Sequence, residues 1–174
     1  MVAGASTRLT QLMEEAVAFS VEHVHEGGIP FSAFVVDQNG QILGRGVNRV
    51  RAHHDPTAHA EVEAIRDACR THGTTDLAGA TLLASGEPCA MCYISAHSAG
   101  ISQVFFAVDR DEVASHGFDY RGSYRLFADD PQTWQSPAVS KLTVSQGLRP
   151  FLAFRSSAPE PKLGLKHLYG VYFR

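Results

Sequence analysis

The chain has 174 residues, of which 44% are hydrophobic and 19% charged, and its formal net charge is −3. This length and balance are typical of one globular domain with a buried core, and they exclude a disordered chain. No apolar run approaches the roughly 20 residues of a membrane helix, and the first ten residues lack a signal-peptide pattern. We therefore expect a cytoplasmic protein. The negative charge also disfavours nucleic acid as a partner.

The first part of the chain is predicted as a helix followed by a β-hairpin. Apolar residues at spacings of three and four predict an amphipathic helix over residues 10–25, ended by Gly27-Gly28. Residues 31–37 and 41–50 have the composition of strands, and the Asn39-Gly40 pair between them is a strong signal for a hairpin turn. We therefore expect the second strand to fold back on the first.

The middle of the chain alternates between helices and short strands. Asp55-Pro56 is predicted to cap and open a helix, and residues 81–84 to form a short buried strand. Pro88 opens a further helix that Gly100 closes, and residues 103–109 follow as another apolar strand. This alternation predicts parallel crossovers and a sheet covered by helices, which is an α/β fold.

The patterns become weaker after this last strand. We expect a helix over residues 111–120, a loop over 127–137 and a further strand over 140–148. Residues 1–155 are therefore assigned to one domain. Residues 156–174 are predicted as a proline-containing linker and an aromatic C-terminal tail.

A split cluster of side chains carries the chemistry of the chain. His59, Glu61, Cys89 and Cys92 combine an imidazole, a carboxylate and two thiols. The two thiols lie three positions apart at the predicted start of a helix, so they share a face where the helix dipole favours thiolate. With Cys69 they make an odd number of cysteines without a secretion signal, which argues against disulfides. One imidazole and two thiols are one ligand short of a closed structural zinc site, as in catalytic zinc sites.

Zinc at this cluster is expected to lower the pKa of a coordinated water to about 7, which supplies hydroxide near neutral pH. Glu61 follows His59 by two positions and points in a different direction, so we predict a proton shuttle rather than a metal ligand. The alternatives are a structural zinc or no metal. A structural zinc needs a fourth ligand, and His53 and His54 fall in the loop before the helix.

Two residues outside the cluster are candidates for substrate contact. Asn48 follows the second predicted strand, where an asparagine either forms a turn or reads the edge of a substrate ring. Phe31 either packs in the core or forms a wall of the ring pocket. The residues alone leave both alternatives open.

Residues 55–66 (D-P-T-A-H-A-E-V-E-A-I-R) and 87–92 (E-P-C-A-M-C) resemble the cytidine-deaminase-like superfamily, and within it the bacterial guanine deaminases. The order H-x-E followed by P-C-x-x-C is the zinc signature of base deaminases. The resemblance covers about residues 9–154. It implies a three-layer α/β/α fold, with a central mixed sheet of about five strands and helices on both faces.

The resemblance also implies roles for individual residues. His59, Cys89 and Cys92 would bind zinc, and Glu61 would shuttle protons while zinc-bound hydroxide displaces the amine as ammonia. It further implies a homodimer in which residues 156–174 close the active site or exchange between subunits. The implied substrate-binding residues are Phe31, Asn48, Ala60, Asp119 and Tyr120.

The chain departs from the family pattern near the expected pocket. Phe118-Asp119-Tyr120 stands where guanine deaminases carry Phe-Asp-Asp, so a phenol replaces a carboxylate expected to contact the base. We expect a small aminoheterocycle as substrate, guanine or a related purine-type base, with water as co-substrate. The alternatives are a cytosine- or cytidine-like base, a pterin, or another specialised nucleobase or nucleoside. A tRNA adenosine deaminase is disfavoured by the charge, and a non-catalytic zinc-binding module by Glu61.

Overall fold

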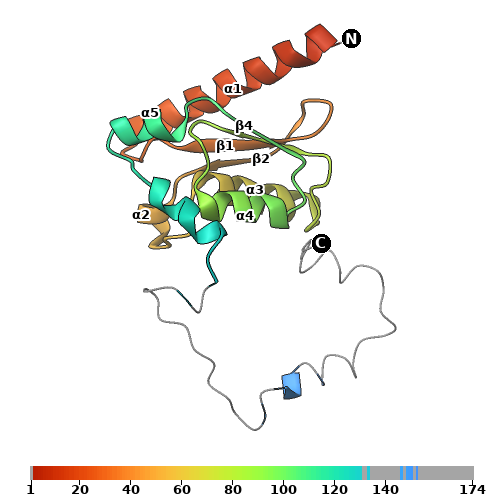
Figure 1. The fold of residues 1–174 in the computed structure, drawn as a ribbon. Helices are drawn as coiled ribbons and strands as arrows, with labels where there is room; N and C mark the ends of the chain where they lie inside the picture. Colours follow the sequence, from red (N-terminus) through yellow and green to blue (C-terminus); the bar gives the residue numbers. More distant parts are fainter. Residues whose placement is uncertain (1, 131–132, 134–145, 147, 151, 153–174) are drawn as a thin grey trace.

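The computed structural model describes residues 2–130, 133, 146, 148–150 and 152 (Figure 1). The expected linker and tail over residues 156–174 lie outside the described residues, as does most of the strand expected over 140–148. The elements in chain order are α1 (Val2–His25), β1 (Ser32–Val36), β2 (Ile42–Val47), α2 (Val50–His53), α3 (Ala60–His72), β3 (Thr81–Ala84), α4 (Ala90–Ser98), β4 (Gln103–Phe106), α5 (Arg110–Ser115) and the 3₁₀ helix η1 (Arg121–Phe127). No helix in this part of the chain is long and apolar enough to cross a bilayer.

The strands form one mixed sheet in the order β2-β1-β3-β4. The predicted hairpin is confirmed, because β1 pairs antiparallel with β2 across a turn in which Gly40 has a positive φ. β1 also pairs antiparallel with β3, whereas β3 and β4 are parallel and joined through α4. The expected count of about five strands is wrong for the described chain. Four segments make the ladder hydrogen bonds, and β4 forms one edge.

Helices cover both faces of the sheet, as predicted. Figure 1 shows α1 on one face and α3 with α4 on the other. Successive strand residues point to opposite faces, so each face has its own apolar cluster. The face toward α1 buries Leu12, Ala16, Phe34, Val36 and Leu83. The face toward α3 and α4 buries Ala33, Val35, Ala60, Ala64, Ile65, Ala68, Leu77, Ala80, Leu82, Ala96 and Ala99.

Helix α3 packs closely on β2 because the contact is made by small residues. A Cβ atom added at Gly46 would collide with backbone atoms of Ala60 and Ala64. A Cβ added at Gly44 would collide with the backbone of Ala64 and Ala68. Glycine is thus required here by close approach rather than by its φ angle. The contact fixes the N-terminal end of α3 relative to the sheet.

The start of α3 differs from the sequence prediction. The helix begins at Ala60 rather than at Asp55-Pro56. The Asp55 carboxylate accepts hydrogen bonds from the backbone N–H and the hydroxyl of Thr57, at 2.7 and 2.6 Å. These bonds make a local turn that competes with helix. The delay leaves His59 as the N-cap residue, at the mouth of the helix rather than inside it.

Three other boundaries also moved. α1 begins at Val2, eight residues before the predicted start, and residues 50–53 form α2 rather than the end of a strand. The helix expected over 111–120 is the shorter α5, which a capping box of Asp109 and Glu112 opens. A side chain that satisfies the first free N–H groups determines where such a helix starts.

Candidate active site

Two helix N-termini meet at the split cluster. His59 is the N-cap of α3 and Cys89 the N-cap of α4, with Cys92 one turn further along α4. His59 Nδ1 lies 3.5 Å from Cys89 Sγ and 3.4 Å from Cys92 Sγ, and the two sulfur atoms are 3.5 Å apart. Tetrahedral nitrogen and sulfur ligands of one zinc ion lie about 3.6–3.8 Å apart. The three donors therefore fit a zinc ion in both type and spacing, and together they form a candidate metal site.

The protonation of the thiols also suits a cation. The hydrogen bond with Cys92 is the main cause that lowers the pKa of Cys89, to about 4. The same contact, together with burial, raises the pKa of Cys92. These shifts favour a thiolate at Cys89 while Cys92 keeps its proton. A buried thiolate beside an imidazole is stabilised by a bound cation, which also displaces the remaining proton.

Glu61 is the carboxylate at this cluster. It is 5% exposed, and its Oε2 atom lies 3.3 Å from Cys92 Sγ. Burial raises the pKa of Glu61, as it does for carboxylates that transfer protons near neutral pH. Glu63, two positions on, instead pairs with Arg66 at 2.7 Å. Of these two acidic residues in the first turn of α3, Glu61 is the one at the cluster.

Aromatic rings lie beside the metal cluster. Phe31 contacts Phe118 edge to face with ring centroids 5.3 Å apart, and Tyr120 with centroids 6.5 Å apart. Tyr120 also packs against the small apolar cluster that includes Cys89 and Cys92. The predicted substrate residues Phe31 and Tyr120 are therefore together, next to the candidate metal site. A wall of rings is suited to a flat heterocycle.

Asn48 has a structural role that the sequence left open. Its side-chain Oδ1 atom accepts a hydrogen bond from Val50 N at 3.1 Å, which makes it a turn residue at the end of β2. Its backbone N–H bonds Phe31 O at 3.0 Å, and its backbone carbonyl accepts from His23 Nε2 at 2.9 Å. Contact between the Asn48 amide and a base stays a prediction. So does the role of Ala60, which is fully buried at the first position of α3.

The last two predicted substrate residues, Asp119 and Tyr120, make hydrogen bonds within the chain. The Asp119 carboxylate accepts from Arg121 Nη2 at 2.7 Å and from Arg121 Nε at 2.9 Å, which lowers its pKa to about 2. The Tyr120 hydroxyl donates to the backbone carbonyl of Glu87. Burial raises the pKa of Tyr120, so this hydroxyl stays protonated. The Asp119 carboxylate is thus paired with Arg121, and Tyr120 has no carboxylate. A substrate role for Asp119 stays a prediction.

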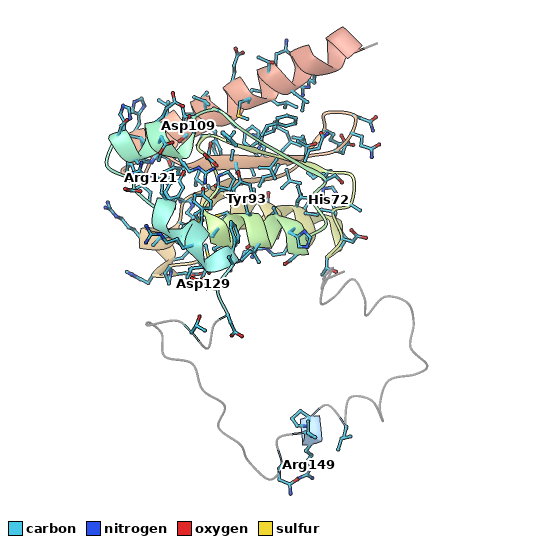
Figure 2. The ribbon with its side chains drawn as sticks, viewed as in Figure 1. His72, Tyr93, Asp109, Arg121, Asp129 and Arg149 are labelled. Atoms are coloured by element: carbon cyan, nitrogen blue, oxygen red, sulfur yellow. The ribbon has the colours of Figure 1, made fainter. Side chains whose placement is uncertain are left out.

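The structure adds residues that the sequence analysis missed. Glu87 is 6% exposed; its carboxylate accepts from Arg110 N at 2.8 Å and pairs with Arg110 Nε at 3.3 Å. The Arg110 guanidinium lies 4.4 Å from the centre of the Tyr124 ring. Figure 2 labels Tyr93 on α4 and Arg121 at the start of η1, the element that also carries Tyr124. No local sequence signal indicated this network, because Tyr120 and Tyr124 are four residues apart and i,i+4 residues share a face in an α-helix but not in the 3₁₀ helix observed here.

Comparisons with known proteins agree with this geometry. Residues 6–108 match the family model of the cytidine and deoxycytidylate deaminase zinc-binding region. The chain is 37% identical over 147 residues to guanine deaminase of Bacillus subtilis (strain 168), covering 84% of this chain and 93% of that protein. It is also 39% identical over 82 residues to a tRNA-specific adenosine deaminase of Aquifex aeolicus (strain VF5), covering 47% of this chain and 54% of that one.

A solved structure shows the same architecture. The crystal structure of guanine deaminase from Bacillus subtilis superposes with a TM-score of 0.78 at 34% sequence identity, over 88% of this chain and 97% of that chain. This similarity confirms the expected cytidine-deaminase-like α/β fold, apart from the strand count. The family match extends over more than half of the chain and includes His59, Glu61, Cys89 and Cys92. The chain therefore belongs to the zinc-binding cytidine and deoxycytidylate deaminase family, hydrolases that act on C–N bonds of nucleobases.

Proposed function

We propose that the chain removes the amino group of a small free aminoheterocycle by zinc-dependent hydrolysis, with guanine or a related purine-type base as substrate. The observation that carries this proposal is the buried Glu61 carboxylate, whose Oε2 atom lies 3.3 Å from Cys92 Sγ, one of the three clustered metal donors. The similarity to a guanine deaminase over 84% of this chain supports the purine-type base.

His59, Cys89 and Cys92 would hold the zinc ion, which as a Lewis acid lowers the pKa of the water that attacks the ring. Glu61 takes a proton from that water and passes it to a ring nitrogen, while a C–O bond forms at the amine-bearing carbon. Glu61 then carries the second proton to the amine, the C–N bond breaks and ammonia leaves. Its buried position holds the carboxyl next to the reacting atoms throughout.

Phe31 and Tyr120 would form a wall beside the ring, and the Asn48 amide would contact its edge. The wall is apolar on the side of Phe31, so it excludes water from one face of the base. The Asn48 backbone is held on both sides, by Phe31 O and by His23 Nε2, which fixes where its side chain emerges. These contacts position the base but perform no proton transfer.

A second class of substrate has its own support. Tyr120 stands where the resemblance predicts a carboxylate, and its hydroxyl is bonded to Glu87 O. A base that needs a carboxylate acceptor at this position, as guanine is expected to, loses a partner. A cytosine-like base or a pterin is therefore the alternative substrate. A tRNA substrate has less support, because the net charge is −3 and the tRNA-specific adenosine deaminase of Aquifex aeolicus aligns with 47% of this chain.

The oligomeric state of the chain is also inferred. We infer a homodimer from the family resemblance, with residues 156–174 closing or exchanging over the active site. A cytoplasmic location is likewise proposed from the composition. Sedimentation of the purified full chain at several concentrations checks the dimer; a monomer at all concentrations would contradict it.

The substrate is tested by measuring ammonia release from guanine, adenine, cytosine, cytidine, guanosine and pterin with the purified zinc-loaded chain. We expect release from at least one free base, with guanine or a related purine fastest. Fastest release from cytosine or pterin would favour the alternative. No release from any compound would contradict the proposed function.

A substitution at Tyr120, where the chain departs from the family pattern, tests directly whether this residue determines the substrate. Tyr120→Asp supplies the carboxylate that the resemblance predicts, so we expect the ratio of kcat/KM for guanine over that for the other bases to rise about tenfold. Tyr120→Phe is the matched control, because it removes the hydroxyl without adding a carboxylate. An unchanged ratio in Tyr120→Asp would show that this position does not read the base.

A further inference from the structure

Three side chains from one short segment bind the backbone of the loop that carries Cys89. The Tyr124 hydroxyl donates to Pro88 O at 2.5 Å, and the Tyr120 hydroxyl donates to Glu87 O. Ser123 Oγ accepts a hydrogen bond from Ala90 N at 3.2 Å. We call residues 87–90 the metal loop. All three bonds connect positions 33 or 36 residues apart in the sequence.

The metal loop needs these partners because its own N-cap side chain is used elsewhere. Cys89 is the N-cap of α4, but its side chain makes no capping hydrogen bond. Its sulfur atom instead lies among the metal donors. The first N–H groups of a helix need an acceptor, and Ser123 supplies one to Ala90 N from outside the helix. A helix that starts with a metal ligand is thus capped by a residue of another segment.

The two tyrosines are themselves held in place. Their rings contact each other with centroids 6.5 Å apart. Tyr124 also stacks under Arg110, whose guanidinium pairs with the buried carboxylate of Glu87 at 3.3 Å. Glu87 belongs to the metal loop, so the contacts of Tyr124 lead through Arg110 back to the same loop that the Tyr124 hydroxyl binds. Hydroxyls on rings that are already packed lose little freedom when they bond, so they are suited to fixing a backbone.

We propose that Tyr120, Ser123 and Tyr124 form a clamp that positions Cys89 and so slows the loss of the metal ion. The proposal rests on the proposed function, since it requires zinc at His59, Cys89 and Cys92. The three clamp members are positioning residues and contact neither zinc nor substrate through their hydroxyls. The clamp also accounts for Tyr120 at a place where the resemblance predicts a carboxylate, because a carboxylate has no proton to donate to Glu87 O.

Zinc release from the full-length holoprotein tests the clamp. The double variant Tyr120→Phe/Tyr124→Phe removes both hydroxyls and keeps both rings. Hydrogen-bonding groups around metal ligands are worth about 10–100-fold in metal affinity, so we expect zinc transfer to a colorimetric chelator to be at least about tenfold faster. Tyr93→Phe is the matched control. The Tyr93 ring lies 6.3 Å from that of Tyr124, and its hydroxyl makes no hydrogen bond within the described residues.

A second measurement separates positioning from general stability. The two lost hydrogen bonds should lower the thermal midpoint of the metal-free double variant by only about 4–8 °C relative to Tyr93→Phe, while the zinc release rates of the two variants differ about tenfold or more. Equal zinc release from the double variant, Tyr93→Phe and the wild type would overturn the clamp and leave the proposed function intact. A wild-type chain that binds no zinc would instead contradict the proposed function and, with it, the clamp.

Discussion

The two halves of the metal site are held in place by different physical means. The half on α3, with His59 and Glu61, is fixed by backbone-to-backbone packing of α3 on β2, where Gly46 leaves no room for a side chain. The half on α4, with Cys89 and Cys92, is fixed by hydroxyl groups that reach the metal loop from η1 and the residue before it. The α3 half therefore depends on a glycine that has no side chain at the contact. The α4 half depends on three side-chain hydroxyl groups.

This difference predicts different responses to mutation. Packed backbone cannot yield to an added atom without moving the helix, so damage on the α3 side is large and affects folding. A hydrogen bond between a side chain and the backbone has a net worth of about 1 kcal/mol, so damage on the α4 side is small and graded. The α3 half also carries the proposed proton shuttle, which makes its chemistry the more sensitive of the two.

The largest expected effect is the loss of activity in Glu61→Gln. The amide cannot accept and pass on the proton, and general acid–base catalysis is typically worth about 10²–10⁴-fold, so we expect kcat to fall by that factor. Steady-state ammonia release measures it. Glu63→Gln is the matched control, because Glu63 pairs with Arg66 instead of contacting the cluster. Similar activity in the two variants would remove Glu61 from its proposed role.

A smaller effect is expected on stability when the packing of α3 is broken. Gly46→Ala places a methyl group against the backbone of Ala60 and Ala64. We expect the free energy of unfolding to fall by about 2–3 kcal/mol, measured by urea denaturation. Gly122→Ala is the control, since an added Cβ there meets nothing within 4 Å. Equal stability of both variants would show that α3 is not seated as described.

The smallest effect is expected at the external cap of α4. Ser123→Ala removes the acceptor for Ala90 N, and loss of a capping side chain typically costs about 1 kcal/mol. We expect urea denaturation to show a loss of that size, well below the loss in Gly46→Ala. Ser123→Thr keeps the acceptor oxygen and should remain close to the wild type. A loss as large as that of Gly46→Ala would contradict the contrast between the two halves.

Much of the metal site could be predicted from the sequence because its ligands lie near one another along the chain. His59 and Glu61 are two positions apart, and Cys89 and Cys92 are three, so local helical geometry already places them. The clamp could not be predicted in this way. Its members bond atoms 33–36 residues away, and such pairs come together only through the tertiary fold.

Two of the predictions of the fold that were wrong each have their own physical cause. The start of α3 was placed too early, because Asp55 and Thr57 form a hydrogen-bonded turn that resembles a helix cap in sequence. The sheet was expected to have about five strands, but four are present in the described chain, and most of the segment expected as a further strand lies outside it. Turn chemistry and strand pairing both depend on partners that propensity alone does not reveal.

The zinc content of the purified chain and its variants, measured by plasma mass spectrometry, tests directly whether one ligand from α3 and two from α4 form a single zinc site. The wild type and Glu61→Gln should each contain about one zinc per chain, whereas His59→Ala and Cys89→Ala, one from each half, should contain almost none. A wild type without zinc, or either ligand variant with a full complement, would contradict a single shared zinc site.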